Sequence, residues 1–349
     1  MAYSVNAKIA GMKPYSPISV KYRIRLDANE SFIAPPPEIA KHISEAAASV
    51  RFNRYPDPYA GELCHAFAGY YGIPAENVVA GNGSDELISL FESSFLMKGE
   101  TLVTLSPDFS MYRFYSGLNE TNCCEFKKND DFTVDVGRLI DTVNEKKARM
   151  VIFSNPCNPT SLGLKREEIR RLLKSVDALV VLDEAYMDFW DQSLLSEVND
   201  YDNLVILRTC SKAMGLAGIR LGFAVTDYRI ADLLRAVKSP YNVNAVTQRI
   251  GAAVLSETDW LKNCRKNIIA SKNSLYNLLK PLEPEGVKAV DGVTNFVTVR
   301  LKNGVQVWNE LLKQGIAVRC FGNFLRITAG TDEENRAVVK ALAAAVQAD

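Results

Sequence analysis

The sequence predicts an α/β protein, with a large three-layer domain around a mostly parallel central sheet and a smaller α+β domain at the C-terminal end. Up to residue 240, short runs rich in β-branched residues alternate with longer helical patterns, which is typical of right-handed crossovers in a parallel sheet. Some runs, such as residues 178–182, are apolar throughout, as strands buried on both faces require. After residue 240 the pattern changes, and a length of 349 residues suits about two domains.

The elements follow from these patterns. We expect strands at residues 78–80, 101–105, 150–154, 179–182, 204–208 and 220–225. We expect helices at residues 38–49, 84–96, 109–117, 135–146, 166–175, 212–216 and 228–237. The C-terminal part begins with a long helical stretch over 244–282. It continues with elements at 292–300, 305–314, 317–319 and 324–328 and a last helix at 332–347.

The first 30 residues are expected to form an N-terminal arm. Pro14 and Pro17, followed by the alternating pattern of residues 21–26, favour an extended segment over a helix. We therefore expect an arm at 1–30, a large domain at 31–245 and a small domain at 246–349.

Composition excludes several classes of function. Lys plus Arg and Asp plus Glu both number 41, so no basic excess is available to hold a nucleic-acid backbone. The N-terminus lacks the apolar core of a signal peptide, and no apolar run approaches the roughly 20 residues of a membrane span. Seven cysteines without a C-x-x-C pair favour free thiols in a reducing cytoplasm, and two histidines make a metal site or a Ser-His-Asp triad improbable.

Lys212 is the first candidate for chemistry. It follows a predicted strand and lies among small residues, so a ligand can approach its backbone closely. A lysine reacts with an aldehyde only where burial or nearby cations lower its pKa. Arg220, eight residues further on, can bind an anion through two N–H groups. On its position alone, Lys212 is better explained as a surface lysine beside a flexible turn, and only the other motifs favour a role in chemistry.

A glycine-rich turn precedes the predicted helix at 84–96. In the segment 81–86, Ser84 and Asp85 open the helix, and its free N–H groups and dipole suit a phosphate. The alternative is simple helix capping.

Two further polar residues follow predicted strands. Asp183 comes directly after the apolar run 178–182, at the edge where α/β sheets bind ligands. An ionised carboxylate there can keep a pyridine nitrogen protonated, although the same Asp also suits a helix N-cap. Asn158 lies in an Asn-Pro turn and can donate to a phenolate-type oxygen, yet such turns need no ligand.

Taken in order, these motifs resemble the pyridoxal-phosphate aminotransferases with the aspartate-aminotransferase fold, and within them the histidinol-phosphate aminotransferases. The resemblance covers the whole chain, from residues 26–30 through 54–58 to 325–331. It implies that Lys212 carries pyridoxal 5′-phosphate and that Asp183 pairs with the pyridine nitrogen. The remaining cofactor contacts that it implies are Asn158 and Tyr186 at the 3-oxygen of the ring, and Ser84, Asp85, Ser211 and Arg220 around the phosphate. It also implies a homodimer with shared active sites, in which Tyr55 reaches the phosphate from the neighbouring subunit.

The substrate side of the site rests on the same resemblance. It implies that Arg319 and Arg326, with Asn29 and with Tyr15 of the partner's arm, bind the substrate. The implied reaction is transamination between L-histidinol phosphate and 2-oxoglutarate in histidine biosynthesis. A threonine-phosphate decarboxylase-like lyase and an aromatic amino-acid aminotransferase are the alternatives. The intact Lys, Asp and Arg set argues against a non-catalytic cofactor-binding domain.

The sequence departs from the family pattern at three positions. Phe109 stands where the family usually stacks a tyrosine on the cofactor ring, so stacking is kept and a hydroxyl is lost. Ser161 replaces a common glycine, and the segment after Asn29 lacks the usual Asn-Pro. We expect these departures to alter loops more than the type of reaction.

Overall fold

The computed structural model describes residues 3–14 and 22–347, and its larger sheet has seven strands. In spatial order they are β2 (Val78–Gly81), β8 (Gly222–Thr226), β7 (Leu204–Thr209), β6 (Leu179–Asp183), β5 (Met150–Ser154), β3 (Thr101–Ser106) and β4 (Asn122–Lys127). The five strands from β7 to β4 are parallel, and β8 runs antiparallel to both β7 and β2. The predicted mostly parallel sheet is confirmed.

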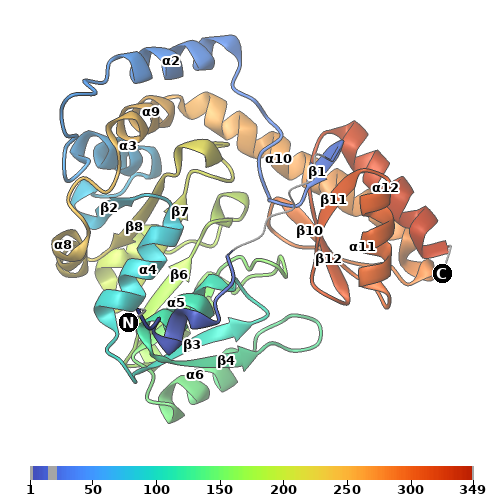
Figure 1. The fold of residues 1–349 in the computed structure, drawn as a ribbon, viewed down its shortest axis with the longest axis horizontal. Helices are drawn as coiled ribbons and strands as arrows, with labels where there is room; N and C mark the ends of the chain where they lie inside the picture. Colours follow the sequence, from blue (N-terminus) through green and yellow to red (C-terminus); the bar gives the residue numbers. More distant parts are fainter. Residues whose placement is uncertain (1–2, 15–21, 348–349) are drawn as a thin grey trace.

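Eight helices accompany this sheet in the described part of the chain (Figure 1). They are α2 (Pro37–Ala48), α3 (Gly61–Tyr71), α4 (Ser84–Phe95), α5 (Met111–Asn119), α6 (Val136–Glu145), α7 (Arg166–Ser175), α8 (Tyr228–Val237) and α9 (Ala245–Ser256). Alternate residues of each central strand enter two different cores. In β5, for example, Val151 and Phe153 pack with α3, α6, α7 and α9, whereas Met150 and Ile152 pack with α4, α5 and α8. Strand alternation thus produces the three layers.

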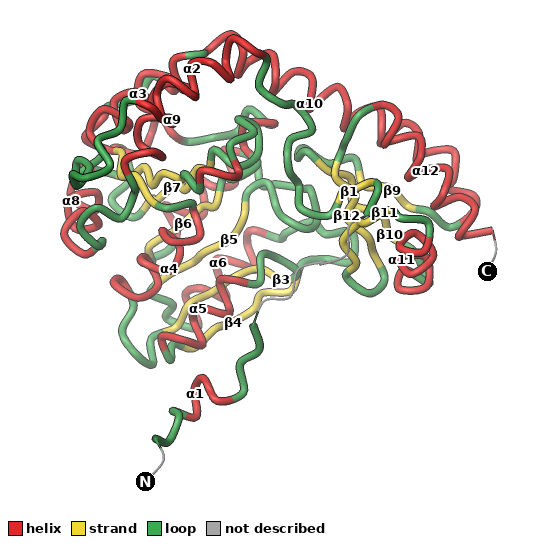
Figure 2. The backbone as a smooth tube through the Cα atoms, turned by 45° about the horizontal axis from the view of Figure 1, so that its top comes forward, coloured by secondary structure: helices red, strands yellow, loops and turns green. Residues whose placement is uncertain are grey.

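The smaller sheet lies in the second domain, beside α10 (Thr258–Leu279), α11 (Gly304–Lys313) and α12 (Asp332–Gln347) (Figure 2). Its strands, in spatial order, are β1 (Ile24–Leu26), β11 (Ile316–Cys320), β12 (Phe324–Thr328), β10 (Phe296–Arg300) and β9 (Lys288–Val290). β1 pairs in parallel with β11, so the end of the predicted arm belongs to this sheet. The domain limits at residues 30 and 245 remain a prediction.

Four details of the predicted secondary structure were wrong. Residues 212–216 form a turn, followed by a short 3-10 helix at Ala217–Ile219, because Gly215 and Arg220 adopt positive φ angles of 68° and 53°. The expected strand at 220–225 therefore begins only at Gly222. The stretch 244–282 is two helices, with a break at Glu257. The edge strand β4 was missed because only one of its six side chains is buried, which leaves no apolar run.

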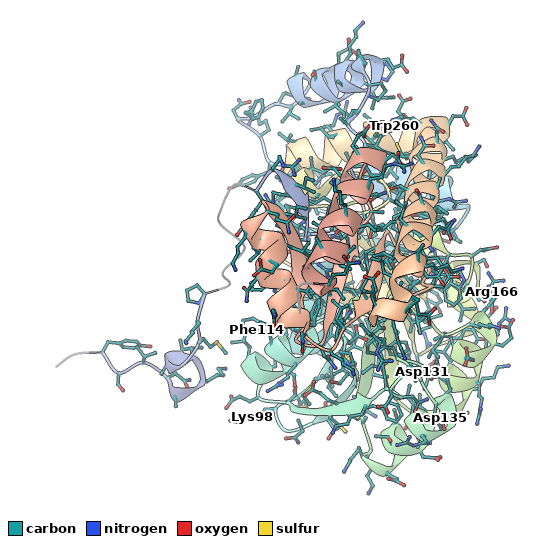
Figure 3. All side chains as sticks on the ribbon, turned by 90° about the vertical axis from the view of Figure 1, so that its right-hand side faces the viewer. Lys98, Phe114, Asp131, Asp135, Arg166 and Trp260 are labelled. Atoms are coloured by element: carbon teal, nitrogen blue, oxygen red, sulfur yellow. The ribbon has the colours of Figure 1, made fainter. Side chains whose placement is uncertain are left out.

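The N-terminal helix α1 (Ala7–Ala10) meets the rest of the molecule at the end of α5, where Lys8 Nζ donates to the Leu118 carbonyl at 2.8 Å. Seen from the side of the small domain, α1 projects beyond the body of the protein (Figure 3). Within residues 3–14 and 22–347, no helix has the length and apolar character needed to cross a membrane.

Glu92 on α4 is a buried carboxyl, and neither of its oxygens has a hydrogen-bond partner among the described residues. Burial raises the pKa of this carboxyl from 4.5 to about 8. Because the pKa is higher in the folded state, the folded protein loses stability as the pH rises from 4.5 through about 8. Glu92→Met should therefore stabilise the protein by about 3 kcal/mol at pH 8.5, and by much less at pH 5.5.

Thermal unfolding of both proteins at the two pH values measures this difference. Glu45→Met, at a position whose side chain is 63% exposed, is the control and should change stability by less than about 0.5 kcal/mol at either pH. An equal gain at both pH values for Glu92→Met would contradict the assigned ionisation.

Candidate active site

Three parallel strands of the large sheet deliver polar side chains to one edge. β5 ends at Ser154 and leads to Asn158, β6 ends at Asp183 and leads to Tyr186, and β7 leads to Lys212. The carboxyl ends of parallel strands lie at the same edge, which is where α/β sheets bind ligands. The chain topology therefore brings together residues that are far apart in the sequence.

Lys212 is a partly buried amine in the turn after β7. Its Nζ donates to the Ala28 carbonyl at 3.0 Å and lies 5.9 Å from the ring centroid of Tyr186. Burial, assisted by the positive charge of Arg326, lowers the pKa of Lys212 from 10.5 to about 8. A lysine with this pKa is partly neutral near neutral pH and can act as a nucleophile or a base.

Asp183 is the buried last residue of β6. Its Oδ2 accepts a hydrogen bond from the Tyr112 hydroxyl at 2.8 Å, and its Oδ1 accepts one from the Ala185 N–H at 3.1 Å. Burial raises the pKa of Asp183 from 3.8 to about 6, so the carboxylate stays mainly ionised at neutral pH. Sequence reasoning missed Tyr112, although it lies in the same motif as Phe109.

Asn29 connects the end of the arm to the site. Its Nδ2 donates to the Tyr186 hydroxyl at 2.8 Å, and its N–H donates to Thr328 Oγ1 at 3.0 Å. Asn29 has a φ of 54°, and its own carbonyl accepts from Asn295 at 3.0 Å. Asn29 therefore fixes the position of Tyr186, a contact that the sequence did not predict.

Arg319 and Arg326 lie directly opposite each other on β11 and β12. The guanidinium of Arg326 donates to Asn158 Oδ1 and to the Asp27 carbonyl, so the small domain reaches the predicted site. Arg319 is half-buried. Two like charges on neighbouring strands repel each other, and a bound anion would relieve that repulsion.

The start of α4 approaches Arg220 closely. Gly83, the N-cap residue, has a φ of 85°, and a Cβ added there would lie 2.9 Å from Arg220 Nη2. A Cβ added at Gly222 would collide with the N–H of Ser84. Arg220 Nη1 lies 3.5 Å from Ser211 Oγ. The glycines thus allow a guanidinium, a hydroxyl and a helix N-terminus to meet, an arrangement suited to a phosphate.

The model for the class I and II aminotransferases matches residues 22–342. The chain belongs to this family. Two curated relatives named histidinol-phosphate aminotransferase, from Clostridium novyi and Clostridium kluyveri, are both 40% identical to it. The first alignment covers 96% of this chain and 95% of the relative, and the second 94% and 95%. A histidinol-phosphate aminotransferase from Sinorhizobium meliloti, solved with pyridoxal 5′-phosphate, has the same fold, with a TM-score of 0.90, 24% identity and 99% of both chains covered.

Two aromatic residues that were expected at the site of this aminotransferase, Phe109 and Tyr55, differ in how exposed they are. Phe109 is half-buried and contacts Tyr112 edge to face, with ring centroids 5.6 Å apart. Tyr55 is 82% exposed and stacks on Tyr241, with ring centroids 4.6 Å apart. Tyr15 lies outside the described residues. Asp85 Oδ2 accepts a hydrogen bond from the Tyr115 hydroxyl at 2.9 Å, and since a carboxylate repels an anion, only the backbone N–H of Asp85 can contact a phosphate.

Ser161, a departure from the family pattern, is buried with a φ of 64°. This backbone conformation favours glycine, which explains why glycine is common at this position in the family. The serine is accommodated where Gly292 leaves space, since a Cβ at residue 292 would collide with the Ser161 side chain.

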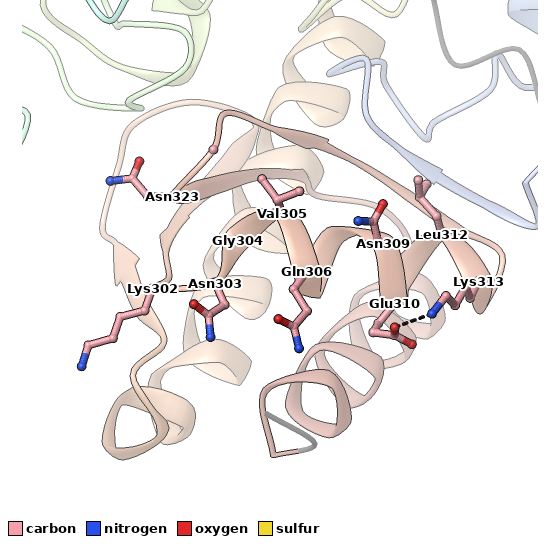
Figure 4. A pocket seen from close by; sticks show the side chains of 11 residues that line it. Lys302, Asn303, Gly304, Val305, Gln306, Asn309, Glu310, Leu312, Lys313 and Asn323 are labelled. Atoms are coloured by element: carbon pink, nitrogen blue, oxygen red, sulfur yellow. Dashed lines mark hydrogen bonds and ion pairs between the residues drawn. The ribbon is translucent and has the colours of Figure 1, made fainter.

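A pocket of about 820 Å³ in this aminotransferase lies away from the residues above, on the small domain (Figure 4). It is open and lies between the start of α11 and the turn before β12, and it is lined by Glu310 and Lys313, which form an ion pair. It contains none of the predicted site residues. Within the described part of the chain, no group of three His, Cys, Asp or Glu residues is arranged to bind a metal.

Proposed function

We propose that this aminotransferase transfers the amino group of L-histidinol phosphate to 2-oxoglutarate, giving imidazole acetol phosphate and L-glutamate. The names of the relatives that are 40% identical over almost the whole chain support this substrate. Among the observations on the molecule, the cross-strand pair of Arg319 and Arg326 carries the proposal. Paired guanidinium groups bind a phosphate monoester or a carboxylate, the anionic groups of the two substrates.

The cofactor of this family is pyridoxal 5′-phosphate, and the residues present fit it. The glycine-lined space between Arg220 and the start of α4 suits its phosphate, the buried carboxylate of Asp183 suits its protonated pyridine nitrogen, and Lys212 suits its aldehyde. When bound, the cofactor supplies an electron sink for negative charge at the substrate carbon.

The side chains have separate tasks in this proposal. Lys212 Nζ would hold the cofactor and would also move the proton at the substrate carbon, for which a pKa of about 8 is suitable. Asp183 would keep a negative charge next to the pyridine nitrogen, while Asn158 and Tyr186 would contact the ring oxygen. Arg319, together with Arg326, would bind the substrate anion.

We further propose a homodimer with active sites at the interface. Tyr55 is 82% exposed, and the arm exposes four large apolar side chains, at Tyr3, Val5, Ile9 and Met12. A second copy that covers these residues would remove apolar surface from water. Light scattering after size-exclusion chromatography tests this proposal, and a monomer at micromolar concentration would contradict it.

A substrate panel tests the reaction. The holoenzyme is mixed in turn with L-histidinol phosphate, threonine phosphate and phenylalanine, while the cofactor spectrum and carbon dioxide release are followed. Conversion of the cofactor to its amino form by L-histidinol phosphate alone supports the proposal. Carbon dioxide release from threonine phosphate would support the decarboxylase alternative instead. Preferential conversion of the cofactor by phenylalanine would support the aromatic amino-acid aminotransferase.

Arg319→Gln is expected to raise the KM for L-histidinol phosphate by about 10- to 100-fold, because a charge-assisted hydrogen bond contributes ~1.5–3 kcal/mol. Steady-state kinetics measure this change, and Arg319→Lys should lose less because it keeps the charge without the planar fork. Arg336→Gln, which removes an exposed helical ion pair with Asp332, is the control. An unchanged KM for Arg319→Gln would exclude this residue from substrate binding.

A further inference from the structure

A buried ion pair, Asp108 with Lys128, lies beside the site. The two side chains are 1% and 2% exposed, and Lys128 Nζ is 3.8 Å from Asp108 Oδ2. The same ammonium donates to the Pro107 carbonyl at 2.9 Å, and it lies 2.7 Å from Cys157 Sγ and 3.4 Å from Thr160 Oγ1. Lys128 therefore connects the loop after β3, which carries Phe109, to the loop after β5, which carries Asn158.

Asp108 contacts the backbone of both loops. Its Oδ1 accepts from the N–H of Phe109 at 2.7 Å and from the N–H of Ser154 at 3.3 Å, and it also accepts from the Ser154 hydroxyl. That hydroxyl oxygen in turn accepts from the N–H of Asn158 at 3.0 Å. A chain of hydrogen bonds thus runs from one carboxylate to the backbone of Phe109 and of Asn158.

We propose that Asp108 and Lys128 are positioning residues, which fix Phe109 and Asn158 relative to each other and thereby orient the cofactor ring between a stacking side chain and an amide. The proposal rests on the roles given to Phe109 and Asn158 in the proposed function. Neither Asp108 nor Lys128 is a catalytic residue, since each acts through the groups that it holds.

The pair is poorly explained as a device for stability alone. Asp108 Oδ2 has no hydrogen-bond partner among the described residues, and a buried ion pair pays a desolvation cost that apolar side chains of similar size avoid. Burial raises the pKa of Asp108, and the charge of Lys128 opposes that rise. The benefit of the pair lies in the directional hydrogen bonds that it makes to two loops.

Asp108→Ala tests the proposal in the holoenzyme. We expect kcat to fall by about 10- to 100-fold, with a smaller change in KM, because the reacting groups lose their alignment. The visible circular dichroism band of the bound cofactor and the pH midpoint of its absorption should also change. Asp108→Asn should be affected less, since its amide oxygen still accepts from Phe109. Lys128→Met is the second variant if Asp108→Ala does not fold.

Asn77→Ala is the matched control. Asn77 is buried before β2 and donates to the Thr226 carbonyl at 2.6 Å and to Asn199 at 2.7 Å, at the opposite end of that strand from Ser84. The Asn77→Ala enzyme should lose thermal stability, while its cofactor circular dichroism band and its kcat stay unchanged. If Asp108→Ala and Lys128→Met behave like this control, the proposal is overturned. A wild-type enzyme that binds the cofactor and rejects L-histidinol phosphate would refute only the substrate, because the spectral comparison of the variants still applies.

Discussion

Replacing Lys212 by alanine is expected to reduce transamination by about 10⁴-fold or more, because in the proposed function this one side chain both holds the cofactor and moves the proton. The reason lies in its surroundings. Burial and the neighbouring Arg326 hold the pKa of Lys212 at about 8, so that a substantial neutral fraction exists near neutral pH. An ordinary exposed lysine, with a pKa near 10.5, would be almost fully charged and unreactive.

Two measurements check this result, namely the transaminase activity and the site at which the cofactor is attached. Borohydride reduction followed by peptide mass analysis should place the cofactor on the peptide with Lys212 in the wild type and on no peptide in the variant. Lys272→Met is the control, because Lys272 is also buried with a lowered pKa, yet its Nζ lies 3.6 Å from Asp291 Oδ1 and donates to the Gly292 carbonyl in the small domain at 2.7 Å. Cofactor attached to another lysine, or activity within tenfold of the wild type, would refute the assignment of Lys212.

The central strands of the large sheet were predictable because burial on both faces leaves a continuous apolar run. β5 and β6 are the clearest cases, since each consists almost entirely of apolar residues and ends at a polar one. The position of Asp183 at the edge of the sheet followed from this pattern. β4 was not predictable in the same way, because an edge strand with exposed side chains has no such run.

The contacts within the site depend on tertiary structure. Asn29 and Tyr186 are 157 residues apart in the chain, and Arg326 and Asn158 are 168 apart, yet both pairs are hydrogen-bonded. Residue type indicated that each could bind a ligand. Residue type could not predict that Asn29 donates to Tyr186, or that Tyr112 donates to Asp183. These contacts depend on which loops lie side by side in the fold, and no local sequence pattern contains that information.

Arg208→Met is expected to destabilise the protein by about 3–5 kcal/mol, because it leaves the buried carboxylate of Glu184 and the largely buried one of Asp188 without a counter-charge. Arg208 on β7 is 4% exposed, and its guanidinium lies 3.0 Å from Glu184 Oε2 and 2.8 Å from Asp188 Oδ1. It also lies over the Tyr71 ring, 5.0 Å from the centroid. Denaturant unfolding of the variant and the wild type measures the loss.

Removing Arg208 should also alter the candidate active site, because Glu184 and Asp188 flank Tyr186 in the sequence. Burial already raises the pKa of Glu184 to about 6, and Arg208 opposes this rise, so removing the arginine raises that pKa further. The destabilisation should then increase with pH, since the folded variant must take up a proton or bury an unpaired charge. Unfolding at pH 6 and at pH 8 separates this effect from a loss of packing, which does not depend on pH.

A partly exposed bidentate ion pair, Arg170 with Glu197, shows by comparison whether burial of the charges causes the destabilisation. Arg170 contacts both carboxyl oxygens of Glu197, at 2.9 and 2.6 Å, with side chains 34% and 22% exposed. Arg170→Met should cost about 1 kcal/mol or less, since water can solvate the carboxylate that remains. Adding Glu184→Gln and Asp188→Asn to Arg208→Met should recover much of the lost stability, because those changes remove the unpaired charges. If the triple variant is no more stable than Arg208→Met alone, the network acts through packing against Tyr71, and burial rather than charge fixes the segment that carries Tyr186.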